Sequence, residues 1–332
     1  MEHSAPNNAS RNKIQDPQAS VPATVVEKKE GNAPVAKPER DIPWLDLGNV
    51  KTPGNALPQY FTNSTSSAER AAMRFGVRGN ALLTGGAGTL ALESARALLE
   101  HGLSGLGLLD LPAVFEKPGV SDAIQSLRRD FPSAAIVCAG IDVTDAEGVE
   151  RVVGEMRSQL GSLNILCCFA GMVYSVNAEN MPADDWRRVI DVNTTGTFLV
   201  AQAVGKQMIA DSLGGRILFI ASISGHSVNY PQPQVAYNVS KAAVLHMRNS
   251  LAAEWSRFGI RVNSISPGYM DTILNEGDSL APFRESWTNR NPMGRMGDPR
   301  EMTGPVVFLC SEVAGSYVNG ADLVVDGGGL VF

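Results

Sequence analysis

A tyrosine and a lysine lie four positions apart in the helical stretch Tyr237–Phe258, at Tyr237 and Lys241. On a helix, these two side chains project from the same face, one turn apart. A free tyrosine has a pKa near ~10 and is a poor base at neutral pH. A nearby ammonium favours the phenolate and lowers this pKa, so Tyr237 could exchange a proton with an alcohol or a carbonyl. The pair is therefore a candidate acid–base site.

Two serines, Ser222 and Ser224, follow the short apolar run Arg216–Ile220. Side chains two residues apart at the end of a strand face the same side, so both hydroxyls are candidates for one task. That task is to hydrogen-bond the reacting oxygen where negative charge develops. The sequence therefore predicts a serine, a tyrosine and a lysine that share one reacting oxygen.

A glycine cluster, Gly85, Gly86 and Gly88, lies between the apolar run Ala81–Thr84 and the helical stretch Ala91–Glu100. Glycines in such a turn let backbone N–H groups and the helix N-terminus approach a pyrophosphate. A strand before the glycines, a helix after them and an acid downstream favour a dinucleotide site over an ordinary turn.

The downstream acid is Asp110, which closes the apolar run Leu106–Leu109. A carboxylate there can accept hydrogen bonds from both hydroxyls of an adenosine ribose, and it would repel a 2′-phosphate. We therefore expect NAD(H) as the preferred cofactor, with NADP(H) as the alternative if Arg74 or Arg78 folds across. A solvated aspartate at a strand end is the other interpretation of Asp110.

The elements that must position these residues alternate along the chain. Short apolar runs alternate with amphipathic stretches, which predicts βαβ units and a parallel sheet. The expected fold class is α/β, a Rossmann-like doubly wound parallel sheet in a single domain. The segments that carry this pattern are Ala81–Thr84, Ala91–Glu100, Leu106–Asp110, Ala134–Ile141, Ala146–Leu160, Ile165–Phe169, Asp185–Ala210, Arg216–Ile220, Tyr237–Phe258, Arg261–Ile265, Pro299–Leu309 and Asp322–Asp326.

The regions outside this pattern differ in composition. Residues 1–43 have no periodicity and few large apolar residues, which predicts a disordered tail. Residues 44–78 are an arm that could be ordered or not, and 79–332 form the expected domain. Within that domain, residues 273–296 are expected to form a lid over the substrate.

The bulk composition excludes several classes of protein. The chain has 332 residues, a formal net charge of −6 and 44% hydrophobic residues. A mildly acidic chain has no electrostatic footprint for nucleic acid, and no apolar run is long enough to span a membrane. The N-terminal residues do not resemble a secretory signal. Neither the cysteines nor the histidines have metal-ligand spacing, so we expect no metal, reduced thiols and a cytoplasmic enzyme.

The chain resembles the short-chain dehydrogenase/reductase family, in its compact branch with one Rossmann-like domain. The family's glycine motif is T-G-x-x-x-G-x-G; this chain keeps Thr84 and Gly85 but has Thr89 and Ala91 at the next two glycine places. The resemblance covers residues 79–329 and implies a dinucleotide held by Gly85, Gly86, Gly88, Thr89, Leu90, Asp110, Asp142, Val143, Ala170, Gly171, Tyr237, Lys241, Pro267, Gly268, Met270 and Thr272.

Several of these residues carry roles that the resemblance implies. Asp142 would meet the adenine amino group, although it could be a plain surface aspartate. Ala170 and Gly171 match the last two residues of the family's N-N-A-G motif, whereas both asparagines are missing. Thr272 and the backbone near Met270, in the family's P-G-x-x-x-T motif, would bind the nicotinamide carboxamide.

The resemblance also implies a catalytic set of Ser222, Tyr237, Lys241 and Asn193. Ser222 fits the S-x-x-G pattern, whereas Ser224 has the more usual spacing to the tyrosine. Lys241 would hold the nicotinamide ribose, and the positive nicotinamide would further favour the phenolate of Tyr237. Asn193 would support a water that links Lys241 to solvent, or would only hold helix backbone.

The loop 222–237 looks like that of the fungal polyol and ketose reductases of this family, such as mannitol, sorbose and arabinitol dehydrogenases. This resemblance implies hydride transfer between a nicotinamide dinucleotide and a ketone or secondary alcohol, on a polyol or ketose. His226, Asn229, Gln232 and Gln234 could hydrogen-bond a hydroxylated substrate, or they could cap their own turns.

Two alternative functions remain open from the sequence. One is a tailoring ketoreductase of a secondary-metabolite pathway. The other, disfavoured by the intact serine, tyrosine and lysine, is a catalytically silent NAD-binding sensor. For assembly, the compact branch implies a homodimer or homotetramer through long helices such as Asp185–Ala210 and Tyr237–Phe258. For the ketoreductase, apolar lid residues could face a larger substrate or could pack the lid down: Leu280, Phe283, Trp287 and Met293.

Overall fold

The computed structural model describes residues 43–49, 51–52, 54–55, 66–272 and 280–332. Contacts divide the chain into Met1–Trp44 and Leu45–Phe332; the sheet and its helices lie in the second unit. The predicted tail, residues 1–43, falls almost wholly outside the described residues.

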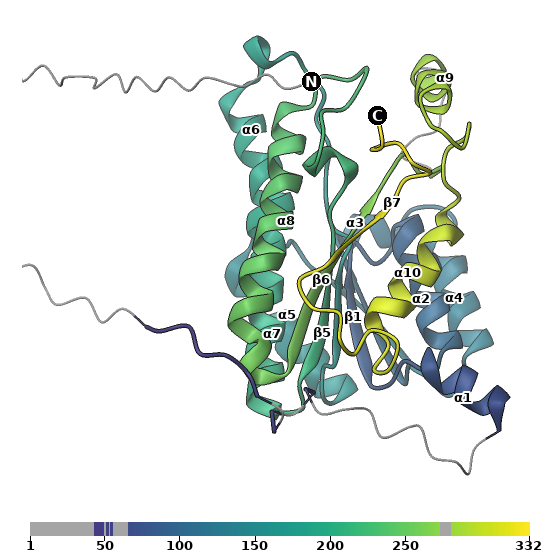
Figure 1. Cartoon of the computed structure of the whole chain (residues 1–332), viewed down its shortest axis with the longest axis vertical. Helices are drawn as coiled ribbons and strands as arrows, with labels where there is room; N and C mark the ends of the chain where they lie inside the picture. The colour runs from purple at the N-terminus through teal and green to yellow at the C-terminus, as the bar shows by residue number, and fades with distance from the viewer. Residues whose placement is uncertain (1–42, 50, 53, 56–65, 273–279) are drawn as a thin grey trace, which may run out of the picture. The chain divides into compact units, whose positions relative to one another are not determined.

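Seven parallel strands form one sheet in the order β3-β2-β1-β4-β5-β6-β7 (Figure 1). The strand order reverses direction between β1 and β4, and this is where open α/β sheets bind ligands at the carboxyl ends of their strands. The fold is therefore the predicted Rossmann-like doubly wound sheet. The strands are β1 Asn80–Thr84, β2 Gly105–Asp110, β3 Ala135–Gly140, β4 Ile165–Cys168, β5 Gly215–Ile220, β6 Ile260–Pro267 and β7 Asp322–Val325.

Helices cover both faces of the sheet, with α5, α7 and α8 on one side and α2, α4 and α10 on the other (Figure 1). The α-helices are α1 Ser67–Arg74, α2 Thr89–Glu100, α3 Pro112–Phe115, α4 Val120–Asp130, α5 Ala146–Leu160, α6 Ala183–Ile190, α7 Thr197–Asp211, α8 Val235–Trp255, α9 Ala281–Asn289 and α10 Thr303–Cys310. Short 3₁₀ turns are η1 Ala178–Asn180, η3 Ile223–Gly225, η4 Ser256–Phe258 and η7 Pro299–Met302.

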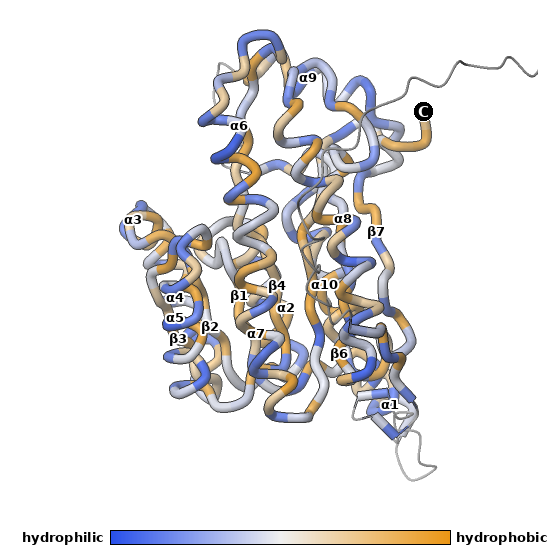
Figure 2. The backbone as a smooth tube through the Cα atoms, turned by 90° about the vertical axis from the view of Figure 1, so that its left-hand side faces the viewer, coloured by the Kyte–Doolittle hydropathy of each residue, from blue (hydrophilic) through white to orange (hydrophobic). Residues whose placement is uncertain are grey.

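The central strands β1, β2, β4 and β5 are largely apolar because both of their faces are buried. In β1, Leu83 packs into the core under α2 and α10, whereas Leu82 packs into the core under α5 and α7. Strand β5 alternates in the same way, with Leu218 on the first side and Phe219 on the second. Figure 2 shows this as hydrophobic colour along the central strands. The sheet is thus a rigid platform for the loops at its carboxyl edge.

The predicted helix Asp185–Ala210 is interrupted in the structure. A π-helical turn, η2 Asp191–Gly196, separates α6 from α7. Apolar periodicity does not detect such a turn, because the core-facing residues on both sides continue a helical pattern. π-turns of this kind are frequent at functional sites.

The described part of the arm 44–78 contacts the domain. Helix α1 begins with a capping box between Ser66 and Glu69, and the carbonyl of Arg74 accepts hydrogen bonds from Ser311 Oγ at 2.9 Å and the backbone N–H of Ala314 at 3.0 Å. Residues 273–279 of the predicted lid lie outside the described residues. Its remaining part contains α9, which is anchored by an ion pair between Arg284 and Asp271 at 2.8 Å.

The four cysteines are free thiols, and the Sγ atoms of Cys167 and Cys310 lie 3.8 Å apart. Among the described residues, no cluster of histidine, cysteine and acidic side chains could hold a metal ion. Within the same residues, no helix is long and apolar enough to cross a membrane.

Candidate active site

The glycine loop after β1 fits tightly against the loop after β4. Gly85 has a φ of +62°, and a Cβ placed on it would lie 2.6 Å from the backbone nitrogen of Ala170. A Cβ on Gly86 would lie 2.7 Å from the carbonyl oxygen of Leu83. Only glycine meets both demands, so the backbone turns sharply and leaves its N–H groups and the N-terminus of α2 facing the carboxyl edge of the sheet.

Asp110 at the end of β2 is held by the same loop. Its Oδ2 accepts the backbone N–H of Ala87 at 3.1 Å, and its Oδ1 accepts that of Leu111 at 2.8 Å. The carboxylate is thus fixed beside the glycine loop, as the prediction of a ribose-binding acid requires. Arg78 precedes β1 at the amino end of the strand, and its carbonyl accepts a hydrogen bond from Arg216. The carbonyl of Arg74 is held by Ser311, which follows α10.

Asp142 and Val143 follow β3. Asp142 Oδ1 accepts hydrogen bonds from the backbone N–H of Thr144 at 2.9 Å and from its hydroxyl at 2.7 Å, and these bonds lower the pKa of the carboxyl. Val143 is buried against Gly196 of the π-turn, where an added Cβ would lie 2.6 Å from Val143 Cγ2. The turn after β3 is therefore tied directly to the irregular helix that carries Asn193.

The loop after β4 brings three predicted residues together. A Cβ on Gly171 would lie 3.3 Å from Asn193 Oδ1 and 3.6 Å from Lys241 Nζ. Next to it, the backbone N–H of Ala170 approaches Thr84 Oγ1 at 3.4 Å. The small side chains at 170 and 171 therefore leave space between the end of β1, the lysine and the asparagine.

Asn193 joins the β4 loop to α8. Its Oδ1 accepts the backbone N–H of Met172 at 2.8 Å, and its Nδ2 donates to the carbonyl of Met172 and to Ser240 Oγ, each at 2.9 Å. Ser240 Oγ in turn donates to the carbonyl of Tyr237 at 2.7 Å. The side chain of Asn193 therefore holds the backbone of the β4 loop and a serine of α8, rather than the backbone of its own helix. Its role in a water relay stays a prediction.

Lys241 lies under the end of β5, where its Nζ donates to the carbonyl of Ile220 at 2.8 Å. Burial of the ammonium lowers its pKa to about 8. The Nζ is 5.7 Å from the ring centre of Tyr237, so the two side chains lie near one another as their helical spacing predicts.

Tyr237 shares a side-chain hydrogen bond with Ser222. Burial raises the pKa of Tyr237, and the hydrogen bond to Ser222 only partly opposes this effect. The predicted lowering of this pKa by Lys241 and a positive nicotinamide stays a prediction, because it needs the bound dinucleotide.

Of the two candidate serines, Ser222 is the one that bonds to the tyrosine. Its hydroxyl donates to Ser224 Oγ at 2.9 Å and accepts the backbone N–H of Ser224 at 3.1 Å. The 3₁₀ turn η3 therefore orients Ser222 with the help of Ser224, and only Ser224 of the two lines the neighbouring cavity.

The P-G-x-x-x-T segment after β6 runs from Pro267 to Thr272 and packs against the end of β7. The N–H of Gly268 donates to the carbonyl of Val325 at 2.9 Å, and a Cβ there would lie 2.9 Å from Asp326 Cα. Met270 is buried, and its carbonyl accepts the N–H of the buried Thr272 at 3.0 Å. Pro267 ends β6 and sets the position of this segment.

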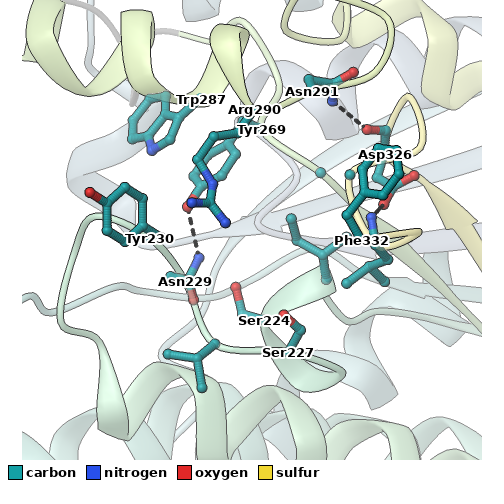
Figure 3. Close-up of a pocket in the computed structure, with 15 residues that line it drawn as sticks. Ser224, Ser227, Asn229, Tyr230, Tyr269, Trp287, Arg290, Asn291, Asp326 and Phe332 are labelled. Carbon is teal, nitrogen blue, oxygen red and sulfur yellow. Dashed lines mark hydrogen bonds between the residues drawn. The ribbon is translucent and has the colours of Figure 1, made fainter.

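A cavity of about 300 Å³ lies next to this machinery, between the loop after η3 and the lid helix α9 (Figure 3). Of the four polar residues predicted to contact substrate, Asn229 alone lines it. The other three are engaged elsewhere: His226 Nε2 lies 2.9 Å from Asp322 Oδ2, Gln232 Oε1 accepts from Trp287 Nε1 at 3.0 Å, and Gln234 Nε2 donates to Ser175 Oγ at 2.9 Å.

The apolar lid residues mostly pack the lid down. Trp287 is buried and stacks on Tyr269, with ring centres 4.2 Å apart and an interplanar angle of 8°. Phe283 packs against the other side of this pair, 6.4 Å from Trp287. Met293 is exposed. Trp287 also lines the cavity, so both interpretations open from the sequence, packing and contact with the cavity, apply to this residue.

Sequence analysis missed several residues that line the cavity. Tyr230 lies in the loop between η3 and α8, and the others follow β6, β7 and α9, where no periodicity or motif marks a side chain as facing a substrate. Asp326 lies beside a glycine run that only suggested the end of the domain. These residues are Tyr230, Tyr269, Arg290, Asn291, Asp326, Leu330 and Phe332.

The family follows from this geometry and from comparison with known proteins. Residues 85–329 match the model of a family described as enoyl-(acyl carrier protein) reductase. The structure of a short-chain type dehydrogenase/reductase from Mycobacterium marinum is similar, with 36% sequence identity and a TM-score of 0.71. The matched region covers 77% of this chain and 98% of that protein. The chain belongs to the short-chain dehydrogenase/reductase family and is an NAD(P)-dependent oxidoreductase that acts on CH–OH groups.

Within this family the chain is similar to enzymes of sugar alcohols. A D-arabinitol 2-dehydrogenase [ribulose-forming] of Scheffersomyces stipitis is 37% identical over 75% of this chain and 92% of its own length. An NADP-dependent mannitol dehydrogenase of Hypocrea jecorina is 36% identical over 79% and 96%. An NADH-dependent L-xylulose reductase of Ambrosiozyma monospora is 34% identical over 74% and 93%. Both forms of the dinucleotide therefore occur among the relatives.

Proposed function

We propose that this chain interconverts a polyol and the corresponding ketose, with Tyr237 as the general acid and base. The observation that carries the proposal is the arrangement of three side chains: Lys241 Nζ lies 5.7 Å from the ring centre of Tyr237, and Ser222 donates to Ser224, which lines the cavity. When bound, the dinucleotide supplies or accepts the hydride. The similarity to sugar-alcohol enzymes supports a hydroxylated substrate.

In this proposal each side chain acts on one oxygen. Ser222 hydrogen-bonds the carbonyl oxygen and orients it, while Ser224 holds Ser222 in place. Tyr237 donates its proton to that oxygen during reduction and takes it back during oxidation. Lys241, one turn further along α8, holds the nicotinamide ribose. Asn193 keeps the β4 loop and α8 in register, and it supports the water that reprotonates the lysine.

The residues fit a dinucleotide at the carboxyl edge of the sheet. The glycine loop leaves space that a Cβ at Gly85 or Gly86 would fill, and the fixed carboxylate of Asp110 can accept both ribose hydroxyls. We propose that NAD(H) is preferred over NADP(H), because the same carboxylate repels a 2′-phosphate. The groups proposed to hold the cofactor are Gly85, Gly86, Gly88, Thr89, Leu90, Asp110, Asp142, Val143, Ala170, Gly171, Tyr237, Lys241, Pro267, Gly268, Met270 and Thr272.

The tailoring ketoreductase is less well supported. It relied on apolar lid residues that face a large substrate. Trp287 lines the cavity but stacks on Tyr269, and Phe283 packs on Trp287. The similar curated enzymes act on sugar alcohols and ketoses by their names. We keep the polyol and ketose function as the conclusion.

We further propose a homodimer or homotetramer that works in the cytoplasm, where the four free thiols stay reduced. Multi-angle light scattering of the purified chain tests the assembly. A monomer at working concentration would contradict it.

The function itself is tested by the rate of NADH and NADPH oxidation with a panel of ketones. We expect turnover of pentuloses or hexuloses, including ribulose, xylulose, fructose and sorbose or their oxidised and phosphorylated forms. An aromatic ketone of similar size is the comparison substrate. Turnover of the aromatic ketone with none of the sugars would sink the proposal.

A further inference from the structure

The cavity contains one cationic side chain that the proposed mechanism does not use. Arg290 follows α9 as its C-cap residue and lines the cavity. Its guanidinium carbon lies 4.5 Å from the ring centre of Tyr230. Figure 3 shows the guanidinium between Tyr230 and Tyr269, directed toward the loop that carries Asn229. The lid therefore presents a positive charge to the space in which the substrate binds.

This charge has no carboxylate partner within the described residues, unlike its neighbours in the lid region. Arg284 pairs with Asp271 at 2.8 Å, and Arg295 pairs with Glu301 at 2.7 Å. For Arg290, the described part of the chain offers the face of an aromatic ring instead. A guanidinium held over a ring keeps its N–H groups available for an oxyanion, which it can bind with two parallel hydrogen bonds.

The acidic residue of the same cavity, Asp326, forms no ion pair with Arg290 within the described residues, and its oxygens accept backbone N–H groups. Asp326 Oδ1 accepts the backbone N–H of Gly328 at 2.9 Å, and Oδ2 accepts that of Leu330 at 2.8 Å. Both carboxylate oxygens are therefore used to shape the turn after β7. A negative group on the substrate would give the guanidinium of Arg290 an ion-pair partner.

A second feature indicates that the same ligand carries hydroxyl groups. Asn229 Nδ2 donates to the hydroxyl of Tyr269 at 3.1 Å, whereas the buried Oδ1 of Asn229 has no hydrogen-bond partner among the described residues. Asn229 lines the cavity, so its amide group is placed to bind a substrate hydroxyl there.

We propose that the substrate is a polyhydroxylated ketone or alcohol with an anionic oxygen group, a carboxylate or a phosphate, that Arg290 binds. This inference rests on the proposed function and narrows its substrate class from neutral sugar alcohols to sugar acids or sugar phosphates. Asn229 binds a hydroxyl of the same molecule, and Ser224 marks the side of the cavity at which the reacting carbon meets Ser222 and Tyr237.

The test compares three ketones of equal carbon number with the full chain and saturating dinucleotide. They are fructose, 5-ketogluconate and fructose 6-phosphate. For wild type we expect a kcat/KM at least ~10-fold higher for one of the charged ketones than for fructose. Arg290→Gln should lose ~10–100-fold on that charged ketone, mainly through KM, and change less than about twofold on fructose. Arg290→Lys should recover part of the loss. Preference for the keto acid or for the phosphate identifies which anion the site takes.

The matched control is Arg151→Gln on α5, because Arg151 is paired with Glu155 and does not line the cavity. It should behave as wild type with all three ketones. An equal loss of Arg290→Gln on charged and neutral ketones would show that Arg290 only holds the lid, and would overturn the inference. So would a wild type that prefers fructose, although the proposed function would then stand. Turnover of none of these ketones, nor of the wider sugar panel, would reject the proposed function and the inference with it.

Discussion

The backbone N–H of Ala87 donates to Asp110 Oδ2 at 3.1 Å, so the glycine loop itself fixes the carboxylate at the end of β2. We predict that Asp110→Ser lowers the NADH to NADPH ratio of kcat/KM by about 10-fold or more, because the repulsion of a 2′-phosphate is removed. The measurement is kcat/KM for both cofactors on one ketone. Wild type that favours NADPH, or an unchanged ratio in the variant, would contradict the proposed preference.

Tyr237→Phe should retain dinucleotide binding but lose about 10²–10⁴-fold in kcat, the range for removal of a general acid–base group. Binding is measured by fluorescence titration with NADH, and turnover by NADH oxidation. Because Ser222 bonds to Tyr237 and Ser224 only supports Ser222, Ser222→Ala should be more damaging than Ser224→Ala. The reverse order would move the catalytic assignment to Ser224.

Burial of Lys241 predicts a distinct dependence of stability on pH. Burial lowers the pKa of Lys241 in the folded protein to about 8, from the ordinary lysine value of 10.5. Between these two values the unfolded chain binds more protons than the folded chain, so this residue makes stability rise with pH, by up to about 1.4 kcal/mol per pH unit. Below the window the burial penalty of the ammonium is fully present.

Lys241→Met removes this titration and serves as the comparison. Urea unfolding of the variant and of wild type at pH 7 and pH 10 should show that wild type gains stability relative to the variant at the higher pH. A difference that stays constant between the two pH values would mean that the lysine is not desolvated.

The close approach of Gly85 to Ala170 predicts an effect on stability. Gly85→Ala should lower the free energy of unfolding by about 1–3 kcal/mol and weaken dinucleotide binding, because its φ is +62° and the new Cβ would meet backbone. Gly154→Ala in α5 is the control, because a Cβ there has no atom within 4 Å. It should be neutral or stabilising by up to ~1 kcal/mol. Equal melting temperatures for the two variants would contradict the geometry of the loop.

Much of the fold could be predicted because the strands are buried on both faces and therefore have continuous apolar runs. The sheet, the family and the reaction class are confirmed. The helix Asp185–Ala210 was predicted without its break, because a π-turn leaves no mark on apolar periodicity. The individual site residues stay predictions that the structure brings close together, and the experiments above test them.

The parts of the site that sequence did not reveal depend on tertiary packing. The raised pKa of Tyr237 results from burial under surrounding loops, which a helical spacing of four residues cannot show. The sequence also could not show that Asn229 and His226 have different surroundings. Both are polar residues of one loop, but His226 contacts Asp322 and Ser266, while Asn229 contacts Tyr269 beside the cavity.

The π-turn Asp191–Gly196 changes which side of the helix faces the active site and which side faces the core. An α-helix advances by about 100° per residue, so one additional residue per turn rotates everything after it relative to everything before. This rotation lets the amide of Asn193 face Met172 and Ser240 while Val200 and Val204 of α7 still face the core. Deleting one residue of the turn would make the helix regular. The amide of Asn193 and the core-facing residues Val200 and Val204 could then no longer both keep their positions. Length, rather than side-chain chemistry, is therefore what the chain must keep fixed between α6 and α7.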